Sequence, residues 1–140
     1  MVKKIISDIV NEAAKAETML GKTNILKKYN DGTNTSIVLM NVLKAAFDPA
    51  IKWALPEGVP PYKPGTGINQ EDALYARAKN LYLFIDGGHP TLKQLKRETL
   101  FIEFLESIHP NDAIMILNAK DKHMPGLNYE VVQEAFPGLL

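Results

Sequence analysis

Apolar positions recur with a helical period along nearly the whole chain. Ile5, Ile9 and Ala13 stand four residues apart, which places them on one face of a helix. No segment shows the strict alternation of a half-buried strand, and no internal repeat is present. The sequence predicts an all-α fold, one compact domain of six or seven helices over residues 1–140. After the first helix, the others are expected at about 19–29, 33–47, 69–85 and 90–108, and from Pro110 and Asn128 onward.

The segment 48–68 departs from this pattern because it is rich in proline and glycine. A regular helix cannot run through it, since each proline lacks an N–H and restricts the residue before it. The segment nevertheless carries large apolar residues, among them Trp53 and Tyr62, that a disordered linker would not need. We expect an ordered proline-rich connection strapped across the helices, with Trp53 filling the core rather than forming a stacking platform.

Several predicted helix ends carry residues suited to capping. The stretch 33–36 offers four polar side chains at the start of the third helix, and Asn69 is expected to cap the fourth, with Asp72 three residues later. His89 and His109 each precede a proline at a helix boundary, where a loop histidine can help to cap the helix.

Composition narrows the class of protein. The chain holds 16 basic and 16 acidic residues, so it has no net charge. It has no cysteine, which excludes a disulfide, a thiolate nucleophile and a cysteine-based zinc site. No apolar run approaches the roughly 18 residues of a membrane span, and Asp8 and Glu12 interrupt the segment after the basic start. We therefore expect no signal peptide and no membrane segment.

The motifs do not indicate catalysis. Residues 28–32, Lys-Tyr-Asn-Asp-Gly, come nearest to the Lys-x-Asp-Gly setting of a nucleotidyltransferase lysine, but they contain one residue too many and lie at a predicted helix end. The three histidines lack metal-binding spacing, and residues 65–67 are too short for a phosphate loop. We expect no catalytic residue, no metal and no cofactor, and therefore no enzyme.

The turn at residues 120–128 is the first candidate for binding. A glycine lets a partner approach the backbone closely, and a helix that starts with an asparagine cap offers free N–H groups and a positive dipole end to a phosphate. Basic side chains add charge, and the contacts would be independent of base sequence. The candidate DNA-binding residues here are Lys120, Lys122, His123, Gly126, Leu127 and Asn128. The alternative is an ordinary helical turn with solvated lysines.

A second candidate lies before and within the fifth predicted helix. Its residues are Gly88, Thr91, Lys93, Lys96 and Arg97, with the three cations on an outer face opposite Leu92 and Leu95. The alternative is a solvated face paired with Glu98 and Glu103. DNA binding is favoured only if this turn and the turn at 120–128 lie side by side.

Residues 112–140 form two short predicted helices, a basic glycine-containing turn and the ending Phe136-Pro137-Gly138-Leu139. This unit resembles the end of the helical N-terminal DNA-binding domain of T-even-type phage ATP-dependent DNA ligases, where a Trp-Pro-Gly-Leu type ending occurs. The opening residues 1–9 and the segment Ile51-Lys52-Trp53-Ala54-Leu55-Pro56 fit the same layout. The chain is also similar to a group of small proteins of tailed phages and cyanophages.

The resemblance implies a phage protein of the host cytoplasm that binds the backbone and minor groove of double-stranded DNA, intact or nicked. It assigns the contacts first to Lys122, Gly126, Leu127 and Asn128, and then to Gly88, Thr91 and Lys93. We therefore expect a non-catalytic, sequence-independent DNA-binding module, an accessory to phage DNA replication or repair. The neutral net charge favours an alternative, a module on the same scaffold that binds a replication or host protein. An enzyme of unrecognised type is the third hypothesis, and the oligomeric state is left open.

Overall fold

The computed structural model describes residues 5–140; residues 1–4, which belong to the ligase-like opening, lie outside the described residues. Within 5–140 the chain forms seven α-helices and one 3-10 helix, and the only strand-like feature is an isolated bridge between Trp53 and Ile85. The all-α prediction is confirmed. The elements are α1 (Ile6–Lys15), α2 (Met19–Lys27), α3 (Asn34–Phe47), α4 (Ala73–Arg77), η1 (Ala78–Phe84), α5 (Gln94–Ser107), α6 (Pro110–Lys120) and α7 (Tyr129–Ala135).

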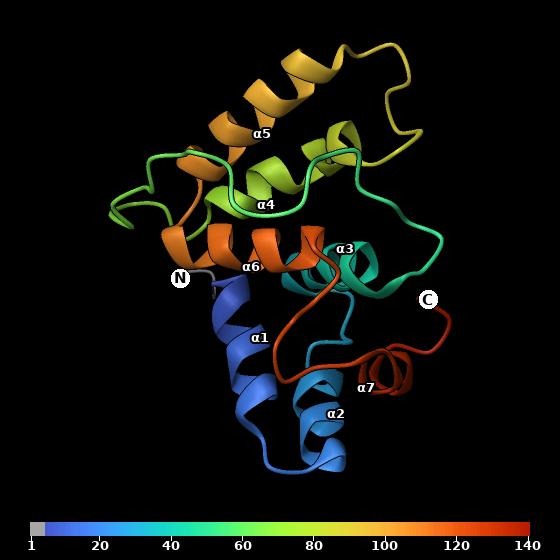
Figure 1. Cartoon of the computed structure of the whole chain (residues 1–140). Coiled ribbons are helices and arrows are strands. Elements are labelled where there is room, and N and C mark those ends of the chain that lie inside the picture. Colours follow the sequence, from blue (N-terminus) through green and yellow to red (C-terminus); the bar gives the residue numbers. More distant parts are fainter. Residues whose placement is uncertain (1–4) are drawn as a thin grey trace.

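Helices α3 and α6 pack against each other in the middle of the molecule (Figure 1). Helices α1, α2 and α7 adjoin them on one side, and α4, η1 and α5 on the other. Helix α6 is buried over most of its length, and every α-helix contributes buried apolar residues to one core. The largest fully buried side chains include Leu39, Leu43, Leu105 and Ile116 from these central and flanking helices.

An aromatic cluster joins η1, α5 and the proline-rich connection. Phe84 lies edge to face with Phe101 and Phe104, at centroid distances of 5.1 and 5.6 Å. Trp53 meets Phe101 in the same geometry at 6.5 Å, and its indole N–H donates to the carbonyl of Ala45 at 2.9 Å. Edge-to-face pairs are the favoured aromatic geometry. The prediction that Trp53 fills the core is confirmed.

The proline-rich connection, residues 48–68, is ordered as predicted and crosses the molecule between α3 and α4 (Figure 1). Its first half is tied to the segment after η1: the N–H of Ala54 donates to the carbonyl of Phe84 at 2.8 Å, and the N–H of Asp86 donates to the carbonyl of Lys52 at 2.7 Å. The amide of Gln94, at the start of α5, donates to the carbonyl of Ala54 at 2.9 Å.

Helix boundaries follow the sequence signals in part. The hydroxyl of Thr33 accepts from the N–H of Ser36 at 3.2 Å, Nδ1 of His109 accepts from the N–H of Asn111 at 3.1 Å, and Asn128 caps α7. These capping predictions are confirmed. The cap assigned to His89 is wrong, because its Nδ1 is buried and has no hydrogen-bond partner within residues 5–140.

The fourth predicted helix was wrong in its start and its form. Asn69 has a positive φ of 57°, so it is not the cap, and α4 begins only at Ala73 before the chain tightens into η1. At the other end, the carbonyls of Leu83 and Phe84 accept from Arg97 and Ala54, and these tertiary contacts replace a continued helical ladder beyond η1.

Candidate functional site

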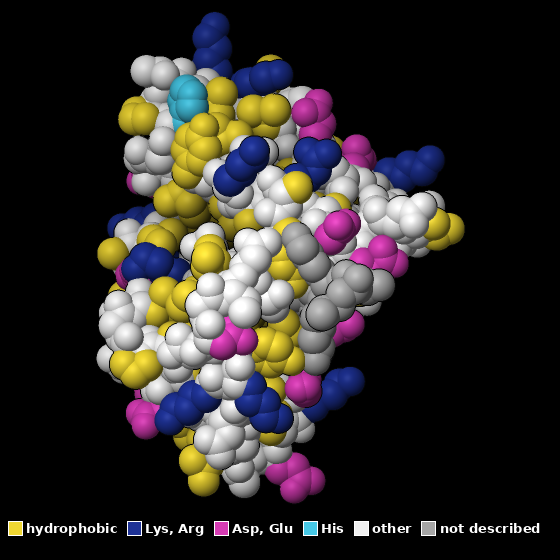
Figure 2. Space-filling model, turned by 180° about the vertical axis from the view of Figure 1, so that it is seen from behind, with side chains coloured by type: hydrophobic (Ala, Val, Ile, Leu, Met, Phe, Trp, Pro, Cys, Tyr) yellow, Lys and Arg dark blue, Asp and Glu magenta, His cyan; other side chains and the backbone are white. Residues whose placement is uncertain are grey.

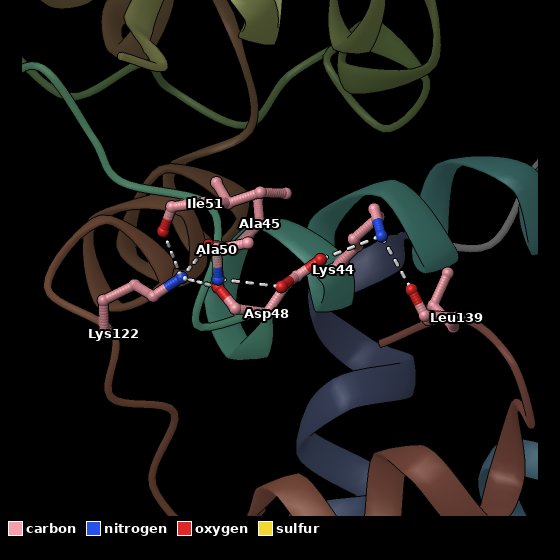
Figure 3. Close-up of polar contacts among 7 residues, drawn as sticks. All are labelled: Lys44, Ala45, Asp48, Ala50, Ile51, Lys122 and Leu139. Atoms are coloured by element: carbon pink, nitrogen blue, oxygen red, sulfur yellow. Dashed lines mark hydrogen bonds and ion pairs between the residues drawn. The ribbon is translucent and has the colours of Figure 1, made fainter. Parts of the chain in front are cut away.

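Lys122, the leading candidate for a phosphate contact, directs its ammonium to the chain's own backbone carbonyls, although the residue itself is exposed (Figure 3). It adopts a left-handed φ of 59°, and its ammonium donates to the carbonyls of Ala45, Asp48 and Ile51 at 3.0, 2.9 and 2.9 Å. Partial burial lowers the pKa of Lys122, and the nearby Asp48 carboxylate opposes that effect. Because Ala45 lies in the last turn of α3 and Asp48 follows its end, the lysine caps the C-terminus of α3, and it also holds Ile51 of the proline-rich connection.

Lys120 is used in the same way. Its side chain is only 2% exposed, and its ammonium donates to the carbonyl of Pro56 at 2.7 Å and to the carboxylate of Asp121 at 2.6 Å. The expectation that Lys120 offers a free charge to DNA is therefore wrong. Its role is to hold the proline-rich connection against the end of α6.

The glycine of the turn serves an internal close approach. Gly126 has a φ of 85°, and a Cβ built there would lie 2.7 Å from the carbonyl oxygen of Ala14 at the end of α1. Its own carbonyl accepts from the ammonium of Lys22. The backbone at Gly126 therefore approaches α1 and not an external partner, and the neighbouring Leu127 is buried.

His123 and Asn128 also lie at exposed positions of the turn. His123 is exposed, although its N–H donates to the carbonyl of Asn118 at 3.0 Å. Asn128 is exposed and caps α7, since its side-chain oxygen accepts from the N–H of Val131 at 2.9 Å. With only seven residues, α7 has a small dipole, so this helix start gives little attraction to a phosphate.

The second candidate turn is also divided between internal and exposed residues. A Cβ at Gly88 would lie 2.0 Å from the carbonyl oxygen of Tyr82, so this glycine is required by the chain's own packing. Thr91, Lys93 and Lys96 are exposed. Among residues 5–140 neither lysine forms an ion pair, so both are free to meet solvent or a partner.

The prediction of which face of α5 points outward was wrong for Arg97 and Leu95. Arg97 is buried, and its guanidinium donates to the carbonyls of Leu83 and His89 and to the side chain of Gln94. Leu95, expected to face inward, is 80% exposed. The buried guanidinium satisfies carbonyls left free after η1, and this requirement outweighs the burial of one leucine.

The two candidate turns do not lie side by side. Figure 1 shows the start of α5 at one end of the molecule and the turn that leads into α7 on the opposite side of α6. On the face drawn in Figure 2, acidic side chains are interspersed with basic ones, and no continuous basic region is visible there. The sequence-based site is therefore split, and Lys120, Lys122 and Arg97 are unavailable to it.

The described residues instead form a groove that the sequence did not predict. It lies between residues 55–61 of the proline-rich connection and the outer face of α5, with a volume of about 440 Å³. Phe101 lies buried beneath it, and half-buried Leu55 and Ile102 add apolar surface. Val59 and Leu95, which also line it, are 70% and 80% exposed. We call this cavity the groove.

The walls of the groove are held in place by polar contacts at both ends of the proline-rich wall. Lys120 fixes the carbonyl of Pro56, and the N–H of Lys63 donates to the carboxylate of Glu106 at 2.7 Å. The intervening Val59, Pro60 and Pro61 span these two anchors. No sequence signal identified the groove, because the exposure of Val59 and Leu95 depends on the fold, and helical spacing placed Leu95 on the inner face.

The comparisons with known proteins give a family. A model described as a family of unknown function, DUF6433, matches residues 9–126. The chain belongs to DUF6433. The matched range of this DUF6433 member includes most of α1, all of α2 to α6, the proline-rich connection and both walls of the groove, whereas α7 lies beyond it. No curated protein and no solved structure matches the chain.

A buried carboxyl group links two helix starts in this DUF6433 member. Asp112, in the first turn of α6, accepts from the N–H of Ser7 in α1 at 2.9 Å. Its other oxygen and the hydroxyl of Ser7 have no partner within residues 5–140. Burial raises the pKa of Asp112, although the bond from the N–H of Ser7 and the charge of His109 act against it.

The described residues show neither a cluster of metal ligands nor a membrane-spanning helix. Within 5–140, no three His, Asp or Glu side chains gather closely enough to hold a metal ion. Over that range no helix combines the length and the apolar character that crossing a bilayer requires.

Proposed function

We propose that this chain is a non-catalytic protein-interaction module that binds a segment of a phage or host protein in the groove. The observation that carries the proposal is the pair of exposed apolar residues, Val59 and Leu95, beside a partly buried apolar lining. Large apolar side chains left in solvent around a concave surface are typical of binding sites. A volume of about 440 Å³ accommodates one or two side chains of a bound segment.

The fixed walls support the same proposal. Lys120, Gln94 and Glu106 tie the proline-rich wall to α5 and α6 through contacts of 2.7 to 2.9 Å. A cavity whose walls are already ordered loses little conformational entropy on binding, which favours affinity. The lack of net charge also fits a protein partner better than DNA, because phosphate contacts normally require a basic surplus.

A library of random peptides displayed on a carrier tests this function. The wild-type protein should enrich binders whose affinity falls at least tenfold for Leu95→Lys, because a charge replaces the apolar lip. The matched control is Leu20→Lys on α2, which introduces the same change at a position 70% exposed and away from the groove. The function would be refuted if no selected peptide bound the Leu95→Lys variant more weakly than the wild type. It would also be refuted if Leu20→Lys weakened binding as much as Leu95→Lys does.

Sequence-independent DNA binding is the second candidate, and the exposed Lys93 and Lys96 at the start of α5 support it. In fluorescence anisotropy with intact and nicked duplexes, two lysines predict a slope of log affinity against log salt of about −2. The double variant Lys93→Glu/Lys96→Glu should abolish this binding without lowering the thermal midpoint. No binding of either duplex at low salt would eliminate the candidate.

A ligase-type architecture and an origin in a phage within the host cytoplasm also belong to the proposal. They stay predictions from the sequence resemblance, because no solved structure or curated protein matches the chain. The groove is defined by its lining residues, whatever the architecture and origin of the protein.

A further inference from the structure

The polar groups that line the groove carry a consistent charge. Three of its lining residues are ionisable: Glu57, Glu98 and Lys120. The ammonium of Lys120 is buried and already paired with Asp121. The side-chain carboxylates of Glu57 and Glu98 form no ion pair or hydrogen bond within residues 5–140. The uncompensated charge of the groove is therefore negative.

The backbone of the proline-rich wall adds further acceptors and few donors. Pro60 and Pro61 have no N–H, and the N–H of Gly58 is directed to the carboxylate of Asp121 at 3.4 Å. The carbonyl oxygens of residues 58–61 accept no hydrogen bond from the described chain. The hydroxyl of Thr99, on the opposite wall, donates to the carbonyl of Leu95 at 3.0 Å. The N–H groups of Glu57 and Val59 also have no partner among the described residues, so free acceptors outnumber free donors in the groove but do not exclude them.

We infer that the occupant of the groove is a segment in which an apolar anchor side chain stands next to lysine or arginine side chains. This inference rests on the proposed function and names the chemistry of its partner. Lysine carries three donors and arginine five, with no acceptor, so both complement carboxylates and free carbonyls. An acidic segment would meet Glu57 and Glu98 with like charge and would be disfavoured.

The apolar and the charged parts of the groove have separate roles. The anchor is expected to contact Leu55, Ile102 and the exposed Val59 and Leu95, which provide most of the buried area. Carboxylates at an exposed rim add little affinity but select between partners of opposite charge. Loss of Leu95 should therefore abolish binding, whereas reversal of the rim charges should change which partner is chosen.

The test compares the sequences selected from the random-peptide library by three proteins. The wild type should select peptides with one or two apolar residues flanked by Lys or Arg. The variant Glu57→Lys/Glu98→Lys should select acidic flanking residues, and it should bind the basic peptides about three- to tenfold more weakly. The control Glu17→Lys/Glu134→Lys changes net charge equally at exposed sites outside the groove and should keep the basic preference.

A second measurement uses the wild type alone and does not depend on a variant's folding. Anisotropy of one labelled basic peptide should show affinity falling as salt rises from about 0.1 to 1 M, where the Debye length shrinks from about 10 to about 3 Å. The inference would be overturned if the peptides that depend on Leu95 were neutral or acidic, or if their affinity did not change with salt. The proposed function would still stand in that case. A selection without Leu95-sensitive binders would overturn both.

Discussion

Replacement of Lys122 by methionine should destabilise the fold, whatever the chain binds. The substitution keeps an unbranched side chain of similar length and removes the ammonium that donates to carbonyls in the last turn of α3 and just beyond its end (Figure 3). A hydrogen bond from a charged donor contributes about 1.5–3 kcal/mol, and a cation at a helix C-terminus adds about 0.3–1 kcal/mol.

The three contacts are not equal, and this limits the expected loss. The carbonyl of Ala45 also accepts from the indole of Trp53, so it stays satisfied in the variant. The contacts to Asp48 and Ile51 lie at exposed positions, where water can replace part of what is lost. We therefore expect the free energy of unfolding to fall by about 2–3 kcal/mol, less than three independent charged bonds would give. For a chain of this length the thermal midpoint should fall by about 7–10 °C.

Urea unfolding followed by far-UV circular dichroism measures this loss, with Lys96→Met as the matched control because Lys96 is exposed and unpaired within the described chain. The control should change stability by less than about 0.5 kcal/mol. Lys122→Gly also lacks the ammonium but relieves the left-handed φ of 59°, so it should be about 1 kcal/mol more stable than Lys122→Met. If Lys122→Met behaves like Lys96→Met, the capping role is wrong.

Two further predictions concern packing and pH. In urea titrations, Gly126→Ala should lower the free energy of unfolding by at least about 1 kcal/mol more than Gly87→Ala does. Both glycines have a φ of 85°, but only a Cβ at Gly126 would press against Ala14. Equal losses for the two variants would contradict the close approach of Gly126 to α1. Because burial raises the pKa of Asp112, the folded state holds this proton more tightly than the unfolded state, so stability falls as pH rises from the ordinary value of 3.8 through the folded-state pKa. Asp112→Asn should flatten that fall in urea titrations over a pH series, and an unchanged profile would refute it.

Local sequence signals predicted the helices and several of their ends because the causes are local. The period of apolar residues in α1 and the capping side chains Thr33 and Asn128 act within one or two turns. The proline-rich connection and the packing of half-buried Trp53 against the core followed from composition alone. The 3-10 segment η1 did not, because the contacts that end the helical ladder come from Ala54 and Arg97, which lie far from it in sequence.

The cations were misassigned for the same reason. A lysine in a polar turn has the pattern of a solvated side chain, and nothing near Lys122 in the sequence identifies acceptors 71 to 77 residues away. The same holds for Lys120 and Pro56, which are 64 residues apart. Leu95 gives the converse error, since helical periodicity alone does not reveal that the buried Arg97 rotates the inner face of α5. A binding site predicted from the positions of charged residues is therefore wrong more easily than a helix predicted from apolar spacing.

The basic side chains that are unavailable for DNA contacts, Lys120, Arg97 and Lys122, help to position the walls of the groove and the segment before it. Lys120 holds Pro56 in the proline-rich wall, and Arg97 fixes the start of α5, the opposite wall, to the carbonyls of Leu83 and His89. Lys122 ties Ile51, near the beginning of the connection, to the end of α3. With these cations held by internal acceptors, the carboxylates of the groove have no free cation among its lining residues. The internal use of basic residues thus produces both the ordered walls and the negative lining, which is why a basic, apolar protein segment fits this surface better than a phosphate backbone does.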